Sequence, residues 1–151
     1  MAGTSWQDYL KLLRDLSHTL EQLTQVEREK NEAAAAGDVQ GVEACMKREQ
    51  AMSMSLRGYD QKRTAMLAAL GLADVRLSGL ADRCPEELRL EAKATAEELR
   101  RQYGLFKAAS EVARHTLELN LRAIERVQNQ RAGDSAQADE ERKSHQTDFR
   151  A

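Results

Sequence analysis

Apolar residues recur at alternating steps of four and three along the first part of the chain. Ser5 and Asp8 form a capping-box pattern before this stretch, and Gly37 follows it. This spacing places an apolar seam along one side of a helix, with the period of a coiled coil. The seam consists of Tyr9, Leu13, Leu16, Leu20 and Leu23, with Trp6, Leu10 and Leu12 beside it. The pattern therefore predicts a first helix between Ser5 and Gly37.

The same period returns after Asp38, which can cap a second helix, and it ends at Gly71. Gly37 followed directly by Asp38 combines a C-cap glycine with an N-cap acid, so we expect a tight helical hairpin. The nine seam positions are Val42, Cys45, Glu49, Met52, Leu56, Tyr59, Arg63, Met66 and Leu70. Because two of them carry a charge, we expect an open seam there or side chains that reach solvent. The methionines of this helix (Met46, Met52, Met54 and Met66) fit either a flexible core or a face for a partner.

A long third helix follows a short connection. Residues 72–84 hold only short apolar pieces, which suits one or two helical turns, and Pro85 fits the first turn of a new helix. From there to about Gln130 the one strong breaker is Gly104, so a helix of about 45 residues would be about 68 Å long. The sequence leaves open whether it bends at Gly104. Residues 132–151 lose the period, which predicts a helical domain over 1–131 and a polar, flexible tail over 132–151.

The long helix carries two apolar faces. Its seam consists of Leu99, Tyr103, Phe106, Ser110, Ala113, Leu117, Asn120, Ile124 and Val127. Leu105, Val112 and Leu119 are spaced by seven and lie about 120–160° around the helix from the Leu117 and Leu121 side. This second stripe could pack on another helix of the bundle, or it could be exposed and bind an amphipathic segment of another protein.

Composition and charge favour an all-α interaction protein. Ala, Leu, Glu, Arg and Lys make up about half of the chain, whereas aromatic residues make up 4% and proline occurs once. A charged fraction of 32% indicates that much of every helix faces water. We therefore expect an elongated antiparallel helical bundle or coiled coil of three main helices, with a short helical connection before the long C-terminal helix. A net charge of −2 argues against a nucleic-acid partner.

No motif for catalysis, metal or cofactor binding is found. His18, His115 and His145 do not form the paired Glu-x-x-His units of a di-iron bundle, and no phosphate loop or nucleophile turn occurs. We expect Cys45 and Cys84 to be buried free thiols. We see no signal peptide and no apolar run long enough to span a membrane, so we expect a cytoplasmic protein that is not an enzyme.

Several short motifs together resemble the FlgN-type flagellar export chaperones over about residues 5–130. They are Gly37-Asp38-Val39 with Lys47, Arg48 and Glu49, the segment from Arg63 to Leu72 (RTAMLAALGL), and Leu117-Glu118-Leu119-Asn120 before Ile124. The resemblance implies a cytoplasmic helical protein. It also implies that this protein holds the hook-filament junction proteins unpolymerised and delivers them to the type III export gate.

The resemblance implies that the C-terminal part of the chaperone binds the C-terminal helices of its cargo, at Leu117, Asn120 and Ile124. We add Leu119, Leu121 and Val127, which lie in the densest apolar part of the long helix. Family members often carry a tyrosine near the C-terminus that contributes to gate docking, whereas here no tyrosine follows Tyr103 and the tail has only Phe149. A self-associating coiled-coil scaffold, a secretion chaperone of another helical type and a catalytic bundle remain alternatives, and a homo-oligomer remains open.

Overall fold

The computed structural model describes the backbone of residues 5–150 and the side chains of residues 5–140. This part of the chain is helical and contains no strand, which confirms the all-α prediction. Its elements are α1 (Trp6–Ala35), α2 (Val39–Ala69), the 3₁₀ turn η1 (Leu77–Gly79), α3 (Leu80–Arg83), the 3₁₀ turn η2 (Glu86–Leu88) and α4 (Arg89–Arg150).

The hairpin between α1 and α2 forms as its sequence predicts. Gly37 adopts the left-handed conformation with φ 71°. The amide of Asp38 donates to the Ala33 carbonyl at 2.8 Å, which completes a Schellman cap on α1. The Asp38 carboxylate then accepts from the Gly41 amide at 3.0 Å and caps α2. At the other end of α1, Ser5 and Asp8 form the predicted capping box.

A second Schellman cap ends α2. Gly71 has φ 74°, its amide donates to the Ala68 carbonyl, and the Leu72 amide donates to the Leu67 carbonyl at 2.8 Å. Leu67 and Leu72 are both buried in the same apolar cluster. The segment from Arg63 to Leu72 thus builds the end of a helix and the start of the connection after it.

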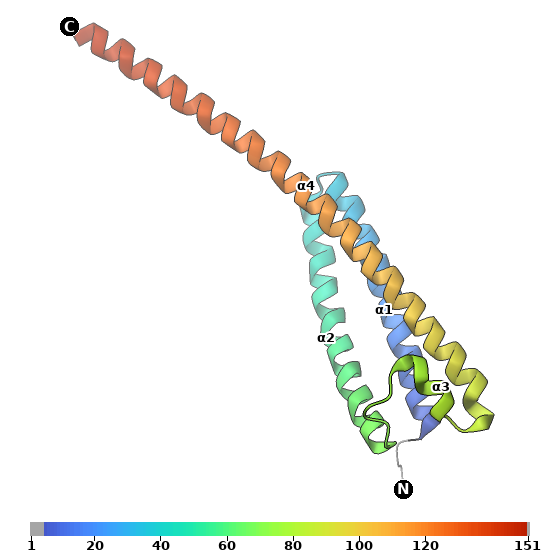
Figure 1. Cartoon of the computed structure of the whole chain (residues 1–151). Helices are drawn as coiled ribbons and strands as arrows, with labels where there is room; N and C mark the ends of the chain where they lie inside the picture. Colours follow the sequence, from blue (N-terminus) through green and yellow to red (C-terminus); the bar gives the residue numbers. More distant parts are fainter. Residues whose placement is uncertain (1–4, 151) are drawn as a thin grey trace.

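The helix α1 lies between α2 and α4 (Figure 1). Arg14 pairs with Glu91 at 2.8 Å and Asn31 meets Thr116 at 2.5 Å, so α1 and α4 run in the same direction. The helix α2, which lies between α1 and α4 in the sequence, runs in the opposite direction. It packs along α1 and makes almost no close approach to α4. The structure therefore confirms the helical elements but gives an open arrangement, rather than a closed three-helix bundle.

The core follows the α1 seam. Tyr9, Leu13 and Leu23 are almost fully buried, and the core cluster joins this seam to the start of α4, the end of α2 and the connection. On α2, most of the predicted seam is only half-buried. A single helix covers α2, so its seam stays partly open, as its two charged positions predicted.

Both charged seam positions of α2 have partners. The Glu49 carboxylate lies 2.6 Å from the Lys30 ammonium of α1, and Lys30 lies 3.2 Å from Glu27. Arg63 pairs with Asp60 at 3.2 Å. These contacts explain how a helix that packs on α1 can carry charges in its seam.

The helix α4 is longer than its hydrophobic period predicted. It continues through residue 130 to Arg150, and its 62 residues correspond to about 93 Å. The predicted end at about Gln130 was wrong, because residues 131–150 lose apolar periodicity but keep good helix formers. The helix α4 (Figure 1) runs through position 104 without interruption of its helical hydrogen-bond pattern. The division into a domain and a flexible tail stays a prediction.

Candidate functional site: the exposed end of α4

Two polar contacts mark where α4 leaves the bundle. The Thr116 hydroxyl lies 2.5 Å from Asn31, and the side-chain amide of Asn120 donates to the Ala34 carbonyl in the last turn of α1. Since α1 ends at Ala35 and the chain reverses at Gly37, α4 continues beyond the hairpin alone (Figure 1).

The segment of α4 that leaves the bundle is rich in exposed apolar side chains. We call residues 117–127 the distal apolar segment. The exposed fractions are 48% for Leu119, 56% for Leu121, 49% for Ile124 and 47% for Val127. At about 100° per residue these four side chains cover an arc of about 200°. An apolar arc of this width on a solvated helix is typical of a surface that binds another protein.

The six predicted site residues fall into two groups. Leu119, Leu121, Ile124 and Val127 are exposed. Leu117 and Asn120 are half-buried, and Asn120 caps the end of α1. The structure therefore places these two at the inner boundary of the distal apolar segment, where they also hold α4 on α1.

The second stripe of α4 is exposed as well. Leu105, Val112 and Leu119 are 37%, 54% and 48% exposed, so the interpretation of this stripe as a bundle contact was wrong. Leu105 and Val112 border a groove between α1 and α4, together with Arg28, Asn31 and Glu32.

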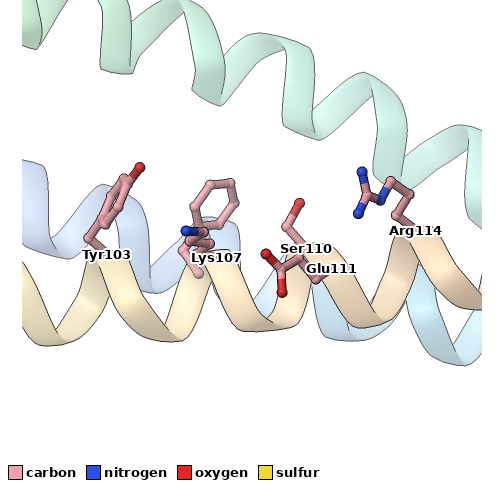
Figure 2. A pocket seen from close by; sticks show the side chains of 6 residues that line it. Tyr103, Lys107, Ser110, Glu111 and Arg114 are labelled. Carbon is pink, nitrogen blue, oxygen red and sulfur yellow. The ribbon is translucent and has the colours of Figure 1, made fainter.

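A hollow that the sequence did not predict lies on the side of α4 that faces α2. Its volume is about 230 Å³, and its lining comes from α4 alone. Figure 2 shows Tyr103, Ser110 and Arg114 pointing from α4 towards α2. Tyr103 is 59% exposed although it was assigned to the seam. Ser110 is a small polar residue in that seam, so the sequence already indicated weak packing at this part of α4.

Charge divides along the distal half of α4. Arg114, Arg122, Arg126 and Arg131 outnumber Glu118 and Glu125 between residues 114 and 131. Acidic residues follow at Asp134, Asp139 and Glu140. The distal apolar segment itself holds Arg122 and Arg126 beside Glu118 and Glu125, so its rim carries both signs of charge.

The methionines of α2 and the two cysteines differ in exposure. Met46 and Met54 are exposed on α2, whereas Met52 and Met66 are half-buried. Cys45 and Cys84 are free and buried, as predicted, and burial raises the pKa of both thiols.

Within the described side chains, no group of three or more His, Cys, Asp and Glu residues could hold a metal ion. His18 and His115 are exposed, and the side chains of His145 and Phe149 lie outside the described part. No helix among the described residues is long and apolar enough to cross a membrane.

A buried charged cluster lies near the hairpin, away from the exposed end. Glu27 is 3% exposed. Its pKa is raised, first by burial and then by the neighbouring Glu49 carboxyl, while Lys30 opposes the rise. Burial alone would lower the pKa of Lys30, but its contacts with Glu49 and Glu27 raise it above the ordinary value. This cluster joins α1 to α2 and has a structural role.

The described part of the chain is all-α and leaves the apolar end of α4 exposed. The sequence model of one family, described as FlgN protein, matches residues 1–133. The chain therefore belongs to the FlgN family, and this membership indicates a role as a flagellar export chaperone. Comparison with curated proteins and with solved structures finds no match.

Proposed function

We propose that this chain is a cytoplasmic chaperone of type III flagellar export that binds the hook-filament junction proteins through the distal apolar segment. It keeps them from polymerising early and delivers them to the export gate. The observation that carries the proposal is the exposure of Leu119, Leu121, Ile124 and Val127 on a helix that has left its bundle.

The proposed mechanism is the pairing of amphipathic helices. A cargo helix would cover the apolar arc of α4, and each Å² of apolar surface removed from water contributes about 25 cal/mol. Ordering of the two partners offsets much of this gain, so the complex stays releasable. Because only the cargo's C-terminal helices need cover, one exposed helix is a sufficient binding surface.

Replacing both Leu119 and Ile124 with Asp tests the proposal. Each substitution puts a charge into the apolar surface that the cargo would cover, so the double variant should lose co-purification with hook-filament junction proteins. The matched control is Leu90→Asp, because Leu90 is 85% exposed on the same helix and lies far from the distal apolar segment. This control should bind like the wild type.

Circular dichroism separates the possible results. We expect the helical signal of the double variant to equal that of the wild type, since both side chains are about half exposed. Undiminished binding by the double variant would contradict the proposed site. Loss of helical signal would show instead that these residues stabilise the fold.

A further inference from the structure

The exposed stripe of α4 has a symmetric spacing. Val112 lies seven residues after Leu105 and seven residues before Leu119, and all three side chains are exposed. Two helices that pair in an antiparallel manner about a two-fold axis place residue i opposite residue j and residue j opposite residue i. A second copy of α4 centred on Val112 would therefore set Leu105 opposite Leu119 and Val112 opposite itself.

The surface beside Leu105 and Val112 is hollowed. Two adjoining hollows of about 340 and 510 Å³ follow α1 and α4 on this side, and they share Arg28 and Leu105. Ala108 and Ala109 lie in the floor beside Val112, where small side chains permit a close approach. The α1 residues that line these hollows are polar. A helix that binds here therefore needs an apolar stripe towards α4 and a polar side towards α1. The helix α4 itself has both.

Charges along α4 favour the antiparallel direction. Arg101 pairs with Glu98 on the same helix at 3.2 Å, and Glu97 lies exposed beside them. Arg126 lies on the corresponding side of the stripe at its other end. In this register an antiparallel copy brings Arg126 level with Glu98 and one residue from Glu97, and it does so twice, whereas a parallel copy brings each charge opposite its own kind.

We propose that a second copy of this chain covers the stripe, and that the two copies form an antiparallel dimer through Leu105, Val112 and Leu119. The spacing about Val112, the groove beside it and the charge order of α4 support the same register. The dimer would cover Leu119, which also belongs to the distal apolar segment, so self-association and cargo binding share this residue. Val112 lies outside the distal apolar segment, so a substitution there acts on the dimer without changing that segment.

Sedimentation equilibrium of the full-length chain tests the dimer. The wild type should associate into a dimer, and Val112→Asp should weaken the dimer by at least about tenfold, because the axis places two carboxylates against each other. Leu90→Asp is the matched control and should sediment like the wild type. Circular dichroism should give the same helical signal for all three chains.

Cysteine cross-linking tests the register. Under mild oxidation Val112→Cys should form a disulfide-linked dimer alone, because the two-fold axis brings position 112 beside its own copy. Leu105→Cys alone and Leu119→Cys alone should not cross-link, whereas an equimolar mixture of the two should. The native thiols at Cys45 and Cys84 are buried, and serine at both positions removes them as a source of cross-links.

Three results would overturn the proposal. The first is a wild-type chain that stays monomeric at its highest soluble concentration, which would leave the stripe to another protein. The second is a Val112→Asp variant that dimerises like the wild type. The third is self-linking of Leu105→Cys as efficient as that of Val112→Cys, because it would indicate a parallel pair. None of these results bears on junction-protein binding, which is measured separately.

Discussion

A single lysine pairs with two carboxyl groups between α1 and α2. The Lys30 side chain is 11% exposed, and its ammonium contacts Glu27 and Glu49. A second cross-helix pair joins Arg48 and Glu29, the residues directly before Glu49 and Lys30, and lies at the surface, where both side chains are substantially exposed. The same kind of pair therefore occurs in a buried and in a solvated setting, and the two settings predict different energies.

Replacing Lys30 with Met should destabilise the fold by about 3 kcal/mol, because it leaves two carboxyl groups buried without a cation. Arg48→Met, the matched control, should cost less than about 1 kcal/mol, because solvent already screens that pair. Urea unfolding monitored by circular dichroism measures both values. Equal losses would contradict a structural role for the buried cluster.

The raised pKa of Glu27 predicts how stability changes with pH. The folded chain holds this proton more tightly than the unfolded chain, whose carboxyl has its ordinary pKa of 4.5. The stabilising contribution is thus fullest below that value and is lost as the pH rises through the raised pKa of the folded state.

Glu27→Gln should therefore flatten the fall in unfolding free energy as the pH rises above 4.5, the ordinary pKa of the carboxyl group. The control is Glu29→Gln, which removes a partly exposed carboxyl from the same helix and should keep the wild-type slope. Denaturant unfolding at a series of pH values checks the prediction. A Glu27→Gln slope equal to that of the wild type would show that the carboxyl does not titrate in this window.

At the residue scale the sequence predicted that charges lie in the α2 seam, but not how they are paired. A charged residue in an apolar period indicates an open seam or a partner, and both Glu49 and Arg63 have partners. The contact of Asn120 with α1 is one that the sequence could not predict. The place of Asn120 in the α4 seam could not reveal that the end of α1 lies beside it, since that depends on how far α1 reaches along α4.

At the scale of the helical elements, glycine has opposite effects at the end and in the middle of α2. Gly71 has φ 74°, a conformation that costs an L-amino acid about 1 kcal/mol or more. Gly58 lies in the exposed interior of α2 and has open space where a Cβ would be placed.

Gly71→Ala should lower the midpoint of thermal unfolding, because alanine strains the Schellman cap that joins α2 to the core. Gly58→Ala should raise it, since alanine is favoured over glycine by up to about 1 kcal/mol inside a helix. Circular dichroism melting of both variants measures the two shifts. Shifts of the same sign would contradict the assigned cap.

The predicted elements match the structure where local chemistry decides them. The caps at Ser5, Asp38 and Gly71 and the period between them defined α1 and α2 closely. The end of α4 was misjudged because the apolar period was used as a marker of the helix. A helix needs that period only where it packs on a neighbour, and residues 131–150 have left the bundle.

At the scale of the whole molecule, the lengths of the helices create the binding surface. The helices α1 and α2 have 30 and 31 residues, whereas α4 has 62, so α4 must continue past the hairpin. The sequence predicted this surplus and the apolar residues on it. It could not decide whether Leu105, Val112 and Leu119 face a helix, because that depends on how α2 packs, and α2 packs on α1 alone.

The proposed function requires that cargo covers the exposed end of α4. Site-specific photo-cross-linking tests it most directly, with a benzophenone side chain at Leu121, which is 56% exposed, and at Leu90 as the control position. We predict that the chain labelled at position 121 captures purified hook-filament junction proteins through their C-terminal helices, and that the chain labelled at position 90 does not. Equal capture from both positions, or none from position 121 in a complex that still forms, would contradict the account.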